Sequence, residues 1–175
     1  MRLLLSAFTF LFLFSCQNNK RIKQANTPKP QMSIIENHKK TIGLDNIAKK
    51  NVSTWNEYKS LQEFLQKFES ISANEAINNA VELSHLVKII KDSIRPKELL
   101  NSPFRARINV LHSEALRLKD MTLIPAITSK EVHNQVAKII EAFSATSTKI
   151  NAVFHQLEVK KEIDIDDTLL KESNN

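Results

Sequence analysis

The sequence predicts an all-α protein, an antiparallel up-and-down four-helix bundle that follows a cleaved signal peptide and a flexible tether. Two observations predict this fold class. Apolar residues recur at spacings of three and four in four successive segments, and only a few residues connect one segment to the next. The chain also has a single glycine and lacks the alternating apolar runs of strands, which argues against sheets.

The longest helical pattern runs from Ser129 to Leu157 and is expected to organise the core. Thr128 and Glu131 have the spacing of a capping box, so the helix is expected to begin there. At ~1.5 Å per residue this helix would be roughly 40 Å long. Its apolar face consists of Val132, Val136, Ile139, Phe143, Thr146, Ile150, Val153 and Leu157.

Three shorter helices are expected to cover that face. The first begins at Thr54, with Glu57 as its capping partner, and ends near Ser70. The second begins at Ser72 and is stopped by Pro96. Their apolar faces consist of Tyr58, Leu61, Leu65 and Phe68, widened by Trp55 and Phe64, and of Ala76, Ala80, Leu83, Val87, Ile90 and Ile94.

The third helix has Ser102 as its expected cap and Pro103 at its first position, where the missing amide of proline costs no hydrogen bond. Pro125 separates this helix from the last one. Its apolar face consists of Phe104, Ile108, Leu111, Ala115, Leu118 and Thr122.

The N-terminus has the layout of a secretory signal: Met1 and Arg2, an apolar run to Phe14, and the small Ser15. That run is shorter than the roughly 20 apolar residues that span a bilayer as a helix. The residues Leu13, Phe14, Ser15 and Cys16 resemble the lipobox of bacterial lipoproteins, with Phe14 where a smaller residue is commoner.

The resemblance covers the first 16 residues and implies that Cys16 is acylated and becomes the first residue of the mature chain. The non-acidic residues after Cys16 imply the outer membrane, and the basic charge of the region implies that the protein faces the periplasm. The alternative is an ordinary signal peptide that contains a cysteine by chance. We therefore expect a signal peptide at 1–15, a lipidated cysteine and mostly flexible basic tether at 16–53, the bundle at 54–157 and a loose acidic tail at 158–175.

The formal net charge of +6 is concentrated in the tether, where basic residues outnumber acids. Attraction to anionic lipid headgroups and simple solvation are equally good interpretations of these charges. A short helix from Ser33, with Glu36 as its capping partner, is one option within this segment. Because the last predicted helix exceeds the others in length, either its end overhangs or part of residues 32–53 folds back against it. The basic residues of the tether are Lys20, Arg21, Lys23, Lys29, Lys39, Lys40, Lys49 and Lys50.

The motifs of the common enzyme classes are absent. One glycine excludes a glycine-rich phosphate loop, a dinucleotide fingerprint and a nucleophile elbow. One cysteine excludes a disulfide within the chain and a cysteine-based zinc site. We expect no enzymatic activity, no cofactor and no nucleic-acid binding.

The histidines do not predict a metal site. Glu82 and His85 form a single Glu-x-x-His element, whereas di-iron bundles use two, and both residues lie opposite the apolar face of their helix. His133 and His155 lie off the apolar face of the last helix and His112 at the border of the third. All of these side chains are expected at the surface.

The most unusual charge placement surrounds the second connection. Arg95 and Lys97 flank Pro96, and Arg105 and Arg107 follow in the first two turns of the third helix. Cations are mildly unfavourable at a helix N-terminus, so this set is a candidate site for an anion or an acidic partner. The alternative is that neighbouring acids or solvent balance the four charges.

The leading functional hypothesis is a lipid-anchored periplasmic envelope protein that acts as a non-enzymatic binding or adaptor module for another envelope protein. The alternative is a carrier of a small ligand or cofactor in a cavity among the helices. Such a cavity would be lined by small or polar core residues such as Ala76, Ala80 and Thr146.

Overall fold

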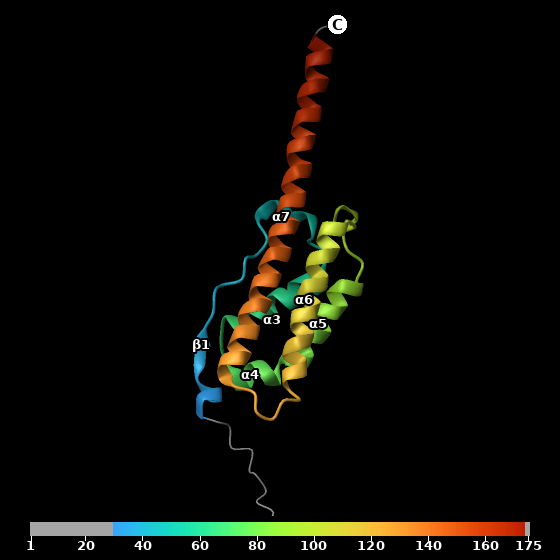
Figure 1. The fold of residues 1–175 in the computed structure, drawn as a ribbon. Helices are drawn as coiled ribbons and strands as arrows, with labels where there is room; N and C mark the ends of the chain where they lie inside the picture. Colours follow the sequence, from blue (N-terminus) through green and yellow to red (C-terminus); the bar gives the residue numbers. More distant parts are fainter. Residues whose placement is uncertain (1–29, 174–175) are drawn as a thin grey trace, which may run out of the picture.

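The structure, a computed structural model, describes residues 30–173, and their side chains from 31 to 164. In this range the protein is mostly helical, with one two-stranded antiparallel sheet (Figure 1). The elements are the 3-10 turn η2 (Pro30–Ser33), β1 (Ile35–Asn37), α2 (Asn46–Asn51), α3 (Asn56–Gln66), the turn η3 (Lys67–Glu69), β2 (Ser70–Ser72), α4 (Ala73–Asn78), α5 (Ala80–Asp92), the turn η4 (Lys97–Leu99), α6 (Ser102–Met121) and α7 (Ser129–Ser173).

The predicted organising helix forms the spine of the molecule as α7. The residues of its apolar face are buried, except Leu157, which is partly buried. The capping box at its start is confirmed. The Thr128 backbone N–H and hydroxyl both donate to Glu131 Oε2, at 2.9 and 2.6 Å, and the Glu131 N–H donates back to Thr128 Oγ1 at 3.3 Å.

The first predicted helix begins later and ends earlier than expected. Its cap is Trp55 rather than Thr54, and no side chain accepts a hydrogen bond there. The Trp55 ring is buried, and its indole N–H donates to Ser93 Oγ at 2.9 Å. Burial of this large side chain therefore takes precedence over the local capping signal. The helix ends at Gln66, since the chain then turns into β2.

The second predicted helix is two helices, α4 and α5, which meet at Asn79. The capping box of Ser72 and Glu75 forms as predicted. At Asn79 the side-chain amide donates to the Glu75 carbonyl oxygen at 2.7 Å, and the backbone N–H donates to the same oxygen at 2.9 Å. The second segment ends at Asp92, so Ile94 lies exposed rather than in the core.

The third predicted helix is confirmed as α6 with its cap one residue earlier. Asn101, not Ser102, is the cap, and its side-chain oxygen accepts from the Phe104 N–H at 2.9 Å. Pro103 accordingly occupies the second helical position, where its missing amide is still harmless.

Residues 30–53, here called the strap, do not behave as the flexible tether expected for them. β1 pairs antiparallel with β2, with Glu36 opposite Ile71, and the last part of the strap packs on α7. The short helix from Ser33 that was one option for this segment does not form, since Ser33 ends η2 and Glu36 lies in β1. The strap buries Met32, Leu44, Ala48 and Val52.

Polar contacts hold the strap to one side of α7. The Ile42 N–H donates to Ser144 Oγ at 3.0 Å, and Asn151 joins Asp45 N–H to the Gly43 carbonyl oxygen at 3.2 Å each. A Cβ at Gly43 would lie 3.0 Å from the Gln62 amide nitrogen, so the chain's only glycine permits close approach to α3. Part of residues 32–53 therefore folds back against the last helix, which is one of the two alternatives stated for its extra length.

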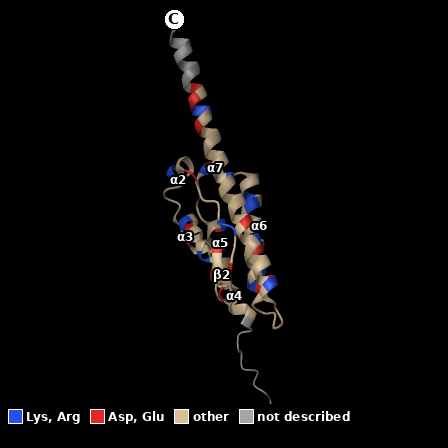
Figure 2. Ribbon diagram, turned by 90° about the vertical axis from the view of Figure 1, so that its left-hand side faces the viewer, with Lys and Arg blue, Asp and Glu red and all other residues tan. Residues whose placement is uncertain are grey.

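α7 continues through most of the segment expected to be a loose tail. Residues 158–173, here called the overhang, project from the rest of the protein at the end opposite to η2 (Figure 1). Val159 and Ile163 are exposed on it, and its described part up to residue 164 carries basic and acidic residues (Figure 2). Among the described helices, none combines the length and the apolarity needed to cross a membrane.

Candidate functional site

A groove of about 630 Å³ lies at the base of the overhang. Its walls are η4 and the first turn of α6 on one side and α7 on the other. Pro103, Val153 and Leu157 supply apolar surface, and Lys149 and Lys160 are basic residues in its α7 wall. A groove of this size that combines apolar surface with cations suits an amphipathic segment with acidic side chains.

The four cations predicted as an anion site do not converge on one point. The Arg95 guanidinium lies over the Phe104 ring at 5.7 Å, and its Nη1 donates to the Lys91 carbonyl oxygen at 3.3 Å. Arg107 Nη1 donates to the Pro103 carbonyl oxygen at 3.1 Å. These two arginines are therefore engaged within the fold.

The other two cations, Lys97 and Arg105, are exposed next to the groove. They neighbour Glu98 and Pro103, which line it. Asp92, one of the neighbouring acids, pairs with Lys88 at 2.8 Å on the surface of α5, and this hydrogen bond lowers the pKa of Asp92. Lys97 and Arg105 are thus exposed, and neither is a lining residue of the groove.

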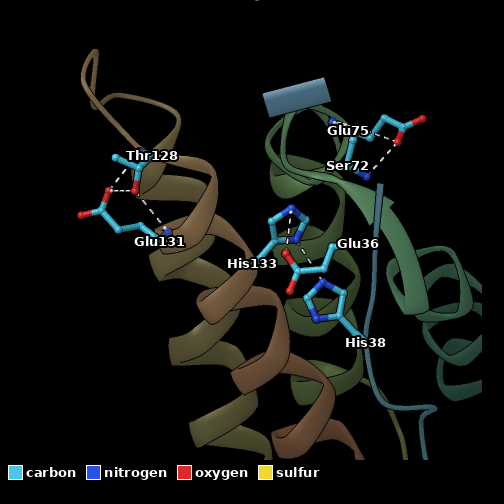
Figure 3. A network of polar contacts seen from close by, with 7 residues as sticks. All are labelled: Glu36, His38, Ser72, Glu75, Thr128, Glu131 and His133. Carbon is cyan, nitrogen blue, oxygen red and sulfur yellow. Dashed lines mark hydrogen bonds and ion pairs between the residues drawn. The ribbon is translucent and has the colours of Figure 1, made fainter. Parts of the chain in front are cut away.

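A second polar cluster joins the strap to α7 and was not predicted. His38 Nε2 lies 3.1 Å from His133 Nδ1, and His133 Nε2 lies 3.7 Å from Glu36 Oε2 (Figure 3). His133, expected at the surface, is 4% exposed because the strap covers it. The pKa of His38 is lowered, mainly because the ring is partly buried and secondly because of the charge of His133. The carboxylate of Glu36 has a smaller effect that raises this pKa.

This cluster of Glu36, His38 and His133, here called the clasp, connects the strap to α7. The two ring nitrogens of His133 point in different directions, one to each neighbour, so the three side chains do not aim at a common metal position. Within the described part of the chain, no group of three or more histidine, cysteine or acidic residues has the arrangement of a metal site. No local pattern indicates this cluster, because His38 and His133 lie 95 positions apart.

The remaining histidines lie near their expected places. Glu82 and His85 are exposed on α5, and His112 is partly buried on α6. Burial and the neighbouring Lys91 lower the pKa of His112. His155 is exposed and lies 3.1 Å from Asp45 of the strap.

The small residues considered for an internal cavity are packed. Ala76 and Ala80 are fully buried, and Thr146 donates to the carbonyl oxygen of Ala142 at 2.9 Å. Close by in the sequence, Ser147 lies 2.7 Å from the Tyr58 hydroxyl, and burial raises the pKa of Tyr58 to about 12. The hydroxyl groups of this region thus bond to the protein itself.

The described residues define a mostly helical protein with a docked strap, open surface grooves and a helix that overhangs. No protein-family model matches the chain, and neither a curated protein nor a solved structure does. Cys16, the predicted lipid attachment site, lies outside the described residues.

Proposed function

We propose that the protein is a lipid-anchored envelope protein whose helical domain binds another macromolecule without catalysing a reaction. The carrying observation is the groove at the point where α7 leaves the rest of the protein. The proposal treats α3, α5, α6 and α7 as the four-helix bundle, because α5 packs on both α3 and α6, and α6 on α7. The groove then occupies one end of the bundle.

The chemistry of the groove favours an acidic protein segment as its occupant. Lys149 and Lys160 line it from α7, and Glu98 is the acidic residue in its opposite wall, so the lining has two cations and one acid. Val153 and Leu157 supply the apolar contacts that give such a complex affinity. The cations favour association with an acidic partner and disfavour a basic one.

A photo-reactive residue in place of Gln156, which lines the groove, tests this proposal in intact cells. We expect one cross-linked protein from this position and none from the matched control at His85, an exposed residue of α5. The same pattern of adducts from both positions would contradict a binding role for the groove.

Charge reversal is the second test of the groove. Lys149→Glu combined with Lys160→Glu is expected to weaken the captured complex by about tenfold, since two exposed charge pairs together contribute roughly 1.4 kcal/mol. Helicity is expected to stay unchanged, as circular dichroism would show. Lys59→Glu with Lys138→Glu, exposed residues of α3 and α7 that do not line the groove, is the matched control and is expected to leave the affinity for the partner unchanged.

Cys16→Ala tests the anchor. The variant is expected to lose acylation and membrane retention, because lipid chains that each gain ~0.8 kcal/mol per buried methylene would otherwise hold the protein to the bilayer. Labelling with a radioactive fatty acid, followed by fractionation, measures both effects. Retention of label in the variant would contradict the assignment of Cys16.

A further inference from the structure

The connection between α6 and α7, residues 122–128, exposes two large apolar side chains. Leu123 is 80% and Ile124 48% exposed, whereas Met121 before them and Ile127 after them pack against the core. Met121 and Ile127 therefore pack on the core at either side, and Leu123 and Ile124 between them are exposed to solvent.

Backbone hydrogen bonds fix this arrangement. The Leu123 N–H donates to the Asp120 carbonyl oxygen at 3.0 Å and the Ile124 N–H to that of Met121 at 3.1 Å. The Ile127 N–H in turn donates to the Ile124 carbonyl oxygen at 3.3 Å. These consecutive turns hold the two apolar side chains outward.

The start of the strap adds apolar surface at the same end of the molecule. Ile34 and Ile35 are each more than 60% exposed, and Ile34 shares a surface groove with Ser129 and Lys130 in the first turn of α7. Figures 1 and 2 both show the strap beginning at the end where α6 connects to α7, opposite to the overhang. The exposed apolar residues thus gather where the N-terminal chain joins the fold.

The length of that chain places this end near the predicted anchor. Thirteen residues, 17–29, connect Cys16 to the first described residue. At ~3.5 Å per residue they reach at most about 45 Å. These thirteen residues include four basic residues and no acidic residue. An acylated Cys16 therefore puts the apolar end within reach of a bilayer, and the basic residues favour one with anionic headgroups.

We propose that this end of the protein docks on the surface of an anionic bilayer and inserts Leu123 and Ile124 among the headgroups. Exposed apolar side chains suit the boundary between headgroups and acyl chains. Lys119 and Lys130 flank them beside the equally exposed Asp120 and Glu131, so the preference for anionic headgroups rests on the basic residues of 17–29. The inference rests on the proposed lipid anchor. Docking in this orientation turns the groove and the overhang away from the membrane, where a partner reaches them.

The test uses the full-length lipidated protein with Leu123→Cys, and Leu100→Cys as the matched control. Both leucines are exposed, and α6 separates them, so they lie at opposite ends of the protein. Because Cys16 is the only native cysteine and is acylated in this protein, a thiol-reactive fluorophore labels only the new position. The protein is reconstituted in vesicles of phosphatidylethanolamine and phosphatidylglycerol with brominated acyl chains, which quench fluorophores that enter the bilayer.

We expect the label at position 123 to lose most of its emission while the label at position 100 keeps it. Adding Ile124→Asp is expected to restore the emission at position 123, since a charge opposes insertion. Equal emission from both positions in protein that floats with the vesicles would refute docking and leave the anchor standing. Protein that does not float refutes the anchor and docking with it. The proposal would also be overturned if the thiol at position 123 were protected from labelling in intact envelopes while its label kept its emission in vesicles. That result would indicate a protein partner at this surface.

Discussion

Phe143→Ala is expected to lower the free energy of unfolding by about 3–5 kcal/mol. The Phe143 side chain is fully buried on α7 and stacks on Tyr58 of α3, with 5.6 Å between ring centroids. Its removal leaves a cavity between the organising helix and the first helix and ends the ring contact, which itself contributes roughly 0.5–1.5 kcal/mol. Urea denaturation followed by circular dichroism measures the change.

Ile163→Ala on the overhang is the matched control for this experiment. Its side chain is 57% exposed, so its loss is expected to change the free energy of unfolding by less than about 0.5 kcal/mol. A comparable loss of stability in both variants would contradict the placement of the core along α7.

Acidification is expected to release the first part of the strap. The hydrogen bond between His38 and His133 needs at least one neutral ring, and protonation of both rings would place two cations 3.1 Å apart. Glu36, 3.7 Å from His133, is exposed and compensates this repulsion only weakly. Lys130 and Lys39, which line the neighbouring grooves, add positive charge on either side.

The other charged groups near His38 do not reverse the expected release of the strap at acid pH. Glu141 of α7 lines the same groove as His38, and the His38 backbone N–H, not its ring, donates to the Glu69 carbonyl oxygen at 2.8 Å. The carboxylate of Glu69 is already engaged by the hydroxyl and N–H of Thr41. Neither carboxylate forms a hydrogen bond with the two rings that would hold them together when charged.

The sign of the effect follows from the lowered pKa of His38. The unfolded chain takes up a proton near the ordinary value of 6.5, whereas the folded chain does so only at lower pH. The free energy of unfolding therefore falls as the pH drops from about 6.5 to the pKa of the folded state, and it is unaffected above that window. His112, whose pKa is also lowered, contributes with the same sign from α6.

Hydrogen exchange of the strap measures this release. Between about pH 7.5 and about pH 5, after correction for the intrinsic pH dependence, the amides of β1 are expected to lose protection before those of α7. His38→Gln keeps a hydrogen-bonding side chain but removes the titration, so it is expected to flatten the dependence. His85→Gln, an exposed histidine of α5, is the matched control. Unchanged protection of β1 in the native protein at acid pH would contradict the clasp.

Local sequence patterns identified only some of the residues in and near the candidate groove. They single out Arg95 and Arg107, which the structure engages within the fold, and Lys97 and Arg105, which it leaves exposed beside the groove. They do not indicate Lys149, because its position opposite α6 depends on how two helices pack. The clasp of His38 and His133 was missed for the same reason.

The sequence by itself determined the helical class and the organising role of α7. It also determined two capping boxes, that of Ser72 at the start of α4 and that of Thr128 at the start of α7. These features depend on residues three or four positions apart, so a local pattern contains all of the information needed. Pro103 also lies in the first turn of α6, one position later than predicted.

Only the tertiary structure decided that the strap docks, that Trp55 replaces Thr54 as a cap and that Asn79 breaks the second helix. The buried strap residues Met32 and Leu44 follow no helical or strand period, because each fits a surface that α7 and its neighbours create after they pack. Contacts across such sequence separations depend on the assembled shape, and no spacing within the strap specifies them.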